Sequence, residues 1–241
     1  MTPRERYRSM REANELMRDP TQKLAVDRLQ SLHHSLKGYK PAGESFLARW
    51  KDRFGLWRRS DAPLIGLYLC GPVGRGKSML MDMFFDTAPV ERKRRVHFHA
   101  FMLEIQQRLN ALRKQEKRAD PLMQVAADVA EESWLLCFDE FHVVNIADAM
   151  ILGRLFEAFF NHGVVVVATS NVAPHDLYKG GLQRDRFLPF IDLIVEKLDI
   201  LDIGAGTDFR LDRLKGEPVW HTPIGRAATA KRLRNGWYLL I

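Results

Sequence analysis

The chain has 241 residues, of which 46% are hydrophobic, and a formal net charge of +7. This length and composition favour one larger α/β domain with short extensions over two equal domains. No run approaches the roughly 18 apolar residues of a membrane span, and Met1–Met17 is charged throughout, so we expect a cytoplasmic protein without a transmembrane segment. Cys70 and Cys137 each lie in an apolar run, which argues against a disulfide or metal framework.

The first predicted element is a helix of about four turns that begins at Asp19-Pro20-Thr21-Gln22. These residues supply an N-cap acceptor, proline at the first helical position and a glutamine three residues after the cap. The glycine-rich stretch 38–43 ends this helix, and Phe46, Leu47 and Trp50 mark a short second one. Residues 1–60 therefore read as an N-terminal helical segment.

Strand-like and helical patterns alternate after this segment. We predict strands at Leu64–Cys70, Arg95–Ala100, Trp134–Phe138, Val164–Thr169 and Leu193–Ile203. The intervening helices are Lys77–Phe85, Phe101–Lys117, Pro121–Glu132, Ala147–Asn161 and Pro174–Leu182. This alternation predicts an α/β fold with a parallel five-stranded sheet and helices on both faces. The pattern becomes sparse after Gly204, with a last helix-like stretch at Ala227–Asn235, so we place a domain edge near Arg210.

A phosphate-binding loop follows the first predicted strand. Its eight positions fit GxxxxGK[ST] and are Gly71, Pro72, Val73, Gly74, Arg75, Gly76, Lys77 and Ser78. Glycines allow backbone N–H groups to curl around phosphates, Lys77 reaches the β/γ oxygens, and Ser78 ligates Mg²⁺. The alternative is a glycine-rich turn with an incidental lysine. The intact pattern favours a site for ATP and Mg²⁺.

Two acids end the third predicted strand. Asp139 is expected to hold Mg²⁺, directly or through water, and Glu140 to polarise the attacking water. The alternative is that the acids stabilise a helix N-terminus. Because the strand is central, its end should lie beside the phosphate loop.

Three further side chains are candidates for the same site. Asn171, after the fourth predicted strand, is placed to orient the lytic water, or else caps the next helix. Arg184 and Arg186 precede an aromatic residue, and a guanidinium can neutralise charge on a transferring phosphoryl group. Arginines near a helix end are also common because they complement its dipole.

In this order, these motifs resemble AAA+ ATPases. More narrowly, the chain resembles the ZapE/AFG-type family of bacterial cell-division ATPases and mitochondrial relatives, from about Tyr7 to Leu214. The matching segments are Gly-Arg-Gly-Lys-Ser-Met-Leu-Met-Asp (74–82), Arg-Val-His-Phe-His (95–99), Leu-Leu-Cys-Phe-Asp-Glu-Phe (135–141), Ile-Ala-Asp-Ala-Met-Ile-Leu (146–152), Ala-Thr-Ser-Asn (168–171) and Gly-Leu-Gln-Arg-x-Arg-Phe-Leu-Pro (181–189).

The resemblance implies a P-loop AAA+ core at 61–210 with strand order 5-1-4-3-2, and ATP bound at a subunit boundary. It implies Arg186 as the arginine finger given in trans, with Arg184 as the fallback, and free thiols at Cys70 and Cys137. The resemblance also implies that Gln22 lies near the adenine. The alternative is that Gln22 belongs to a capping box with Asp19 at the start of the helix described above. The family continues beyond this length with a helical lid, so residues 211–241 read as a truncated C-terminal segment.

The resulting expectation is an Mg²⁺-dependent ATPase that assembles into a ring or partial ring. The resemblance implies that it remodels a protein of the division machinery and associates peripherally with the division site. The basic clusters 92–95, 113–118 and 210–234 leave open a nucleic-acid-binding loader, and a nucleotide-binding regulator with weak catalysis is a third alternative. His97 and His99 are expected to be packed strand histidines rather than zinc ligands.

Overall fold

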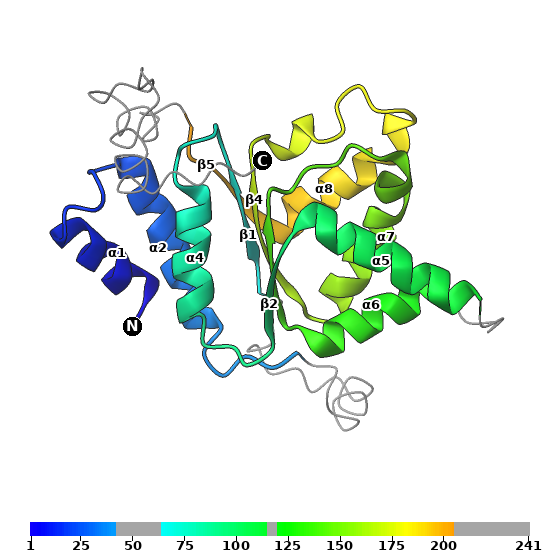
Figure 1. Cartoon of the computed structure of the whole chain (residues 1–241), viewed down its shortest axis with the longest axis horizontal. Helices are drawn as coiled ribbons and strands as arrows, with labels where there is room; N and C mark the ends of the chain where they lie inside the picture. Colours follow the sequence, from blue (N-terminus) through cyan, green and yellow to red (C-terminus); the bar gives the residue numbers. More distant parts are fainter. Residues whose placement is uncertain (42–63, 115–119, 205–241) are drawn as a thin grey trace, which may run out of the picture. The chain divides into compact units, whose positions relative to one another are not determined.

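Figure 1 shows the computed structural model of the chain, which describes residues 1–41, 64–114 and 120–204. All of these residues belong to one compact unit, Met1–Gly206. The predicted helix around Phe46–Trp50, the stretch Ala227–Asn235 and the segment 211–241 lie outside the described residues. The domain limits at 60 and 210 stay predictions.

Five parallel strands form a single sheet in the order β2-β3-β4-β1-β5, which confirms the expected topology. The strands are β1 (Gly66–Cys70), β2 (Lys93–His97), β3 (Leu135–Asp139), β4 (Val165–Ser170) and β5 (Leu198–Asp202). Strand β1 pairs with β4 and with β5, while β3 pairs with β2 and with β4. Because the strands are parallel, the carboxyl ends of β1, β3 and β4 lie together at one edge of the sheet.

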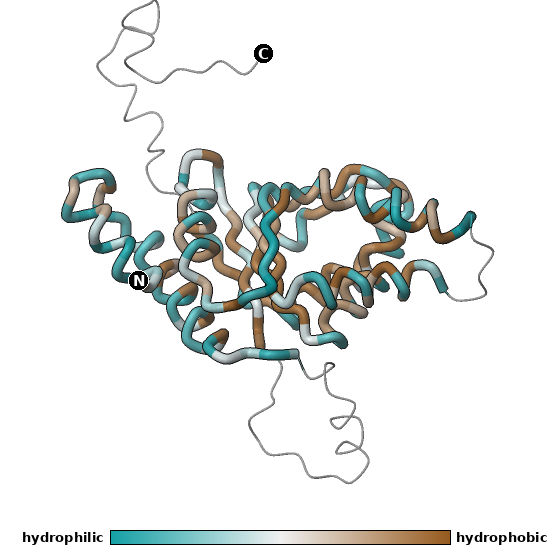
Figure 2. Tube along the Cα trace, turned by 60° about the horizontal axis from the view of Figure 1, so that its bottom comes forward, coloured by the Kyte–Doolittle hydropathy of each residue, from teal (hydrophilic) through white to brown (hydrophobic). Residues whose placement is uncertain are grey.

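Helices cover both faces of the sheet (Figure 1). One face carries α1 (Pro3–Glu12), α2 (Pro20–Ser35) and α4 (Lys77–Thr87), and the other carries α5 (Phe98–Arg113), α6 (Pro121–Glu132), α7 (Ile146–Asn161) and α8 (Leu188–Lys197). The alternation of side chains along a strand divides the core accordingly. In β1, Leu67 and Leu69 join the cluster under α2 and α4, whereas Tyr68 and Cys70 join the opposite cluster. In Figure 2 the apolar residues concentrate along the strands and the helix faces turned toward them.

Two predicted elements are wrong. The segment Leu193–Ile203 is a strand only from Leu198, because 188–197 form the helix α8, which has Pro189 in its first turn. The predicted helix Pro174–Leu182 is only the short 3₁₀ turn η2 (Pro174–Asp176). Tyr178 and Gly180 then take φ of +53° and +73°, and these left-handed conformations prevent a helix.

Smaller corrections concern the second strand and the N-terminus. The predicted strand Arg95–Ala100 is observed at Lys93–His97, and Phe98 begins α5. His97 and His99 therefore do not share one face of a strand. Helix α1 was not predicted, although Thr2 and Glu5 form a complete capping box around Pro3.

Both cysteines are free and buried, on strands separated by β4. Burial raises the pKa of Cys70 to about 11 and raises that of Cys137 as well, so both thiols stay protonated near neutral pH. Within the described ranges, every helix is too short or too polar to cross a bilayer.

Candidate nucleotide-binding site

The phosphate loop connects β1 to α4 at the carboxyl edge of the sheet. Gly71, Gly74 and Gly76 have φ of +144°, +85° and +81°, a region that favours glycine. Gly76 is also the N-cap of α4. The loop therefore has the backbone conformation that its glycines permit, and the N-terminus of an 11-residue helix follows it directly.

Lys77 is held inside the loop. Its Nζ lies 2.7 Å from the carbonyl oxygen of Gly71 and 2.8 Å from that of Pro72, and the residue is buried. The next residue, Ser78, is exposed in the first turn of α4, and Pro72 and Val73 are exposed as well. The loop thus combines a positive charge, the positive end of a helix dipole and an accessible hydroxyl group, as an anion site with a cation ligand requires.

The side chain of Arg75 bonds to residues at the start of α2. Its Nη2 donates to Oδ2 of Asp19 at 2.8 Å, and the pair is almost fully buried. The predicted cap of α2 is confirmed in its first half, because Asp19 accepts hydrogen bonds from the backbone N–H groups of Thr21 and Gln22. Gln22 does not complete a capping box. Its amide instead donates to the carbonyl oxygen of Arg75 at 3.0 Å.

The acid pair stands at the end of β3. Asp139 is buried and accepts from Arg95, with its Oδ2 2.6 Å from Nε and its Oδ1 3.3 Å from Nη2. Arg95 also pairs with Asp82, which lies one turn after Ser78 on α4. Arg95 thus links the Asp139 carboxylate to α4, the helix that carries Ser78 in its first turn. A hydroxyl and a carboxylate from neighbouring elements are the hard oxygen donors that suit Mg²⁺, so Ser78 and Asp139 fit this ion.

Glu140 takes an uncommon backbone conformation. Its φ is +54°, and its N–H donates to Oγ1 of Thr169 on β4 at 3.2 Å. The following N–H, of Phe141, donates to the carbonyl oxygen of Thr169 at 2.7 Å, and the Phe141 ring is buried. The left-handed turn, held from both sides, leaves the Glu140 side chain exposed at the edge of the sheet.

Asn171 is exposed directly after β4. Ser170, not Asn171, makes the local bonds: its hydroxyl donates to the Phe141 carbonyl at 2.7 Å and accepts from the Val172 N–H at 3.2 Å. The N-cap of η2 is Ala173, so the capping explanation for Asn171 is wrong. Within the described ranges the Asn171 amide makes no protein hydrogen bond and can face a ligand.

The two candidate arginines differ in their surroundings. They bound the 3₁₀ turn η3 (Arg184–Arg186). Arg184 is half-buried and donates to the carbonyl oxygen of His175 at 2.7 Å. Arg186 is exposed, and among the described residues its guanidinium has no hydrogen-bond or ion-pair partner, while Phe187 beside it is buried. Arg184 is therefore committed to its own chain, whereas Arg186 can reach another molecule.

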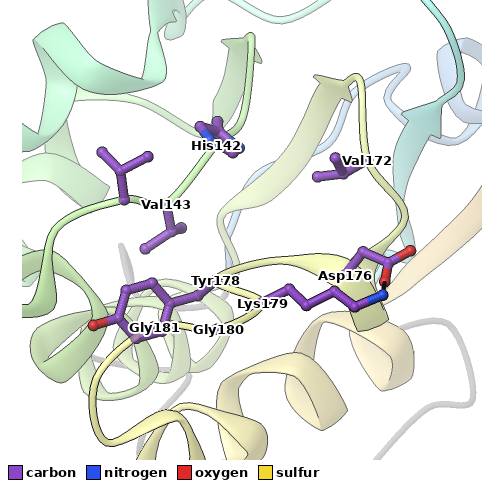
Figure 3. Close-up of a pocket in the computed structure, with 9 residues that line it drawn as sticks. His142, Val143, Val172, Asp176, Tyr178, Lys179, Gly180 and Gly181 are labelled. Atoms are coloured by element: carbon purple, nitrogen blue, oxygen red, sulfur yellow. Dashed lines mark hydrogen bonds and ion pairs between the residues drawn. The ribbon is translucent and has the colours of Figure 1, made fainter.

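A separate pocket of about 540 Å³ is lined by residues that follow β3 and β4 in the chain (Figure 3). His142 and Val172, which follow Glu140 and Asn171 in the chain, line it together with Tyr178 and Lys179. Lys179 is bonded to Asp176 at 3.0 Å. None of residues 71–78 lines this pocket, so the pocket is distinct from the candidate phosphate-binding loop.

Two residues of this region were missed from the sequence. Arg95 lies opposite Cys137 in the sheet register and reaches Asp139, the diagonal neighbour on the same face. Thr169 fixes the Glu140 backbone from β4. A basic residue in a predicted strand is a common pattern, so the register of β2 against β3 was needed to single out Arg95.

Comparison with known proteins agrees with this geometry. Residues 1–240 match the family described as AFG1-like ATPase. Over 230 residues the chain is 42% identical to the cell division protein ZapE of Escherichia coli K12, an alignment that covers 93% of this chain and 60% of that protein. The chain thus spans less than two thirds of the length of this curated relative.

Solved structures show the same fold at low sequence identity. The crystal structure of DnaI superposes with a TM-score of 0.51 and 14% identity, covering 78% of this chain and 87% of that one. A replication initiator DnaA bound to AMPPCP and single-stranded DNA gives a TM-score of 0.52 and 12% identity, covering 92% of this chain and 59% of that one. The sheet order, the phosphate loop and the family match agree, and the chain belongs to the AFG1-like ATPase family of AAA+ proteins.

Proposed function

We propose that this chain binds ATP with Mg²⁺ and hydrolyses it. The observation that carries the proposal is the convergence of three parts at one sheet edge: the phosphate loop after β1, Asp139 and Glu140 after β3, and Asn171 after β4. β4 pairs with both β1 and β3, so the candidate polar group that follows it lies between the loop and the acid pair. Membership of an ATPase family supports the same chemistry.

Each residue then has a defined task. The loop N–H groups and Lys77 bind the phosphates, and Ser78 and Asp139 hold Mg²⁺, which neutralises phosphate charge when bound. Glu140, exposed on its fixed turn, polarises the attacking water, and the Asn171 amide orients that water. Removing charge at Lys77 should therefore affect binding, while removing it at Glu140 should affect only the chemical step.

Three variants test this division of tasks. Lys77→Ala should lose nucleotide binding, and Glu140→Gln should bind ATP normally but lose turnover. Glu131→Gln is the matched control, because Glu131 is an exposed glutamate at the end of α6, away from the sheet edge. Binding of a fluorescent ATP analogue and steady-state phosphate release are measured for each protein. Turnover by Glu140→Gln at the control's rate would show that Glu140 is not the base.

We further propose that Arg186 completes the site of a neighbouring copy in a ring or partial ring. Its exposure and lack of a partner in the described part of the chain support it over Arg184. Arg186→Ala should bind ATP but lose about 10³-fold in turnover, as arginine fingers do. Lys77→Ala binds no nucleotide but still offers Arg186, so mixing the two inactive proteins should restore hydrolysis. Absence of rescue between folded, co-assembling proteins would reject a finger in trans.

The relative named a cell division protein supports a proposal for the cellular role. We propose that turnover remodels a protein client of the division machinery, at a peripheral location at the cytoplasmic side of the division site. A client should raise the ATPase rate of the wild type and should accumulate on Glu140→Gln, which holds ATP. Purified division proteins added one at a time test this, with Lys77→Ala as the control that should retain none of them.

A nucleic-acid loader is less well supported. In the basic cluster 92–95, Arg94 pairs with Glu104 and Arg95 with Asp139, while Lys93 donates to carbonyl groups at the end of α4. These three side chains are therefore bonded to groups of the same chain. Clusters 113–118 and 210–234 lie partly or wholly outside the described residues. Salt-sensitive binding to single-stranded DNA would favour a loader, whereas ATP binding without turnover would favour a regulator.

A further inference from the structure

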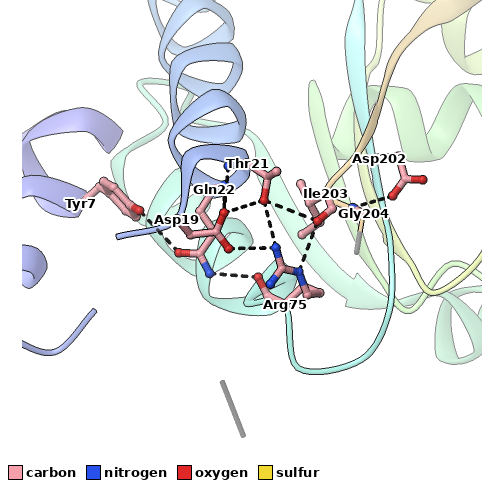
Figure 4. A network of polar contacts seen from close by, with 8 residues as sticks. All are labelled: Tyr7, Asp19, Thr21, Gln22, Arg75, Asp202, Ile203 and Gly204. Atoms are coloured by element: carbon pink, nitrogen blue, oxygen red, sulfur yellow. Dashed lines mark hydrogen bonds and ion pairs between the residues drawn. The ribbon is translucent and has the colours of Figure 1, made fainter. Parts of the chain in front are cut away.

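A buried network ties the outer side of the phosphate loop to two distant parts of the chain (Figure 4). At its centre is Arg75, whose side chain is 2% exposed. Its Nη2 lies 2.8 Å from Oδ2 of Asp19 and 3.0 Å from Oγ1 of Thr21, and its Nε donates to the carbonyl oxygen of Ile203 at 3.2 Å. One guanidinium thus joins the loop to the start of α2 and to the residue after β5.

Gln22 holds the main chain of the same loop residue. Its Nε2 donates to the Arg75 carbonyl at 3.0 Å, and its Oε1 accepts from the Tyr7 hydroxyl at 3.5 Å. A Cβ at Gly76 would stand 2.9 Å from Gln22 Nε2, which shows how closely this amide packs against the loop. The loop is therefore held through both its side chain and its backbone.

The β5 end packs against the beginning of the loop as well. A Cβ at Gly71 would stand 3.1 Å from Cγ1 of Ile203 and 3.4 Å from Oδ1 of Asp202. The Thr21 hydroxyl lies 3.4 Å from the Ile203 carbonyl, which closes the network between α2 and β5. The loop backbone is thus enclosed by groups that come from residues 19–22 and 202–203.

An arginine is always charged and is strongly disfavoured in the protein interior unless its donors are paired. In their present positions, Asp19, Thr21 and Ile203 help to meet this condition for Arg75. Backbone donors that are held in place before an anion arrives bind it more tightly, because less conformational freedom is lost on binding. The positions of α2 and of the β5 end therefore influence the backbone conformation of the phosphate loop.

We propose that Asp19, Gln22 and Arg75 form a latch that positions the phosphate loop and couples nucleotide binding to the docking of α2 and the β5 end. The proposal rests on the nucleotide-binding function proposed above. All three are positioning residues, since they act through the loop backbone. Coupling is reciprocal, so nucleotide should also stabilise the start of α2 and the β5 end.

Substitutions can break the latch without removing the cap of α2. Asp19→Asn keeps an N-cap oxygen but loses the charge, and Gln22→Leu removes the donor to the loop at similar size. Arg75→Met should weaken binding of mant-ATP by up to about 100-fold, and Arg75→Lys should recover part of the loss. Asp27→Asn is the control, because it removes an ion pair on the same helix whose side chains are 64% and 38% exposed.

Affinity is measured well below the melting temperature of every variant, so that a loss of global stability does not contribute. Folded Arg75→Met and Gln22→Leu proteins that bind mant-ATP like Asp27→Asn would overturn the latch. If the wild type itself does not bind mant-ATP, the proposed function fails. The latch is then judged by hydrogen exchange at 71–76 without nucleotide, which Gln22→Leu should accelerate over Asp27→Asn. Equal exchange would overturn it.

A measurement on the wild type covers the case in which the variants do not fold. Addition of Mg²⁺ and AMPPNP should slow hydrogen exchange in the loop, in the first turn of α2 and at Ile203 and Gly204. Helix α6 serves as an internal reference, since it packs against α5 and α7 on the opposite face of the sheet. Protection confined to the loop, with unchanged exchange in the first turn of α2, would overturn the coupling.

Discussion

Replacing Arg95 by methionine tests whether the acid pair is a metal site. The Arg95 and Asp139 side chains are 24% and 9% exposed. Breaking a fully buried pair costs about 3–5 kcal/mol, and an exposed pair is worth about 0–1 kcal/mol. The intermediate burial of this pair places the loss at about 2 kcal/mol. For a chain of this size, such a loss lowers the melting temperature by about 4–8 °C.

Mg²⁺ can replace the charge that Arg95→Met removes. The rise in melting temperature caused by Mg²⁺ with AMPPNP, relative to EDTA without nucleotide, should therefore be larger in this variant than in the wild type. Arg94→Met is the matched control, because Arg94 lies next to Arg95 on β2 and pairs with Glu104 of α5, where both side chains are 28% exposed. Its response to nucleotide should equal that of the wild type. Equal responses in all three proteins, measured by calorimetry, would refute a metal site at Asp139.

The remaining predictions concern the strained turn, the hydrogen bond behind it and acid stability. Glu140→Gly should remove the strain of φ +54° and raise the free energy of unfolding by about 1 kcal/mol while abolishing turnover, as calorimetry and phosphate release can show. Thr169→Val removes the partner of the Glu140 N–H, so it should lower kcat with little change in ATP affinity, and an unchanged kcat would contradict this role. Burial works to raise the pKa of Asp19, but hydrogen bonds from Thr21 and Gln22 and the charge of Arg75 outweigh it and hold this pKa below its ordinary value. The contribution of the Asp19 carboxylate to stability is therefore present above about pH 4 and lost as the pH falls through its lower folded-state pKa. The free energy of unfolding, measured with urea, should therefore fall less in acid for Asp19→Asn than for the wild type.

Local patterns were sufficient to predict the loop and the sheet. The phosphate loop, the strand that precedes it and the helix that follows are dictated by neighbouring residues, and β–α alternation predicted the parallel sheet. The strand order came from the family resemblance. The segment Leu193–Ile203 was misread because its apolar residues continue from α8 into β5, and a short apolar run does not by itself separate a strand from a helix. The backbone changes from helical to extended at Leu198, which is both the C-cap of α8 and the first residue of β5.

Contacts between distant residues could not be predicted in the same way. The inward direction of Arg75 depends on Asp19 and Ile203, which are far apart in the chain. The pairing of Arg95 with Asp139 requires β2 to neighbour β3 in a specific register. The resemblance already favoured Arg186 over Arg184 as the finger, and the exposure of Arg186, which spacing does not reveal, supports that proposal. The contacts of Arg75 and Arg95 could be seen only in the tertiary structure.

Steady-state ATP hydrolysis as a function of protein concentration tests the central claim most directly, namely that these residues form an ATPase completed by a neighbouring copy. The specific activity at saturating Mg²⁺ and ATP should rise with concentration, because only an assembled site receives Arg186. Glu140→Gln should stay inactive over the same range. A specific activity that is constant down to dilute monomer, or no turnover at any concentration, would contradict the account.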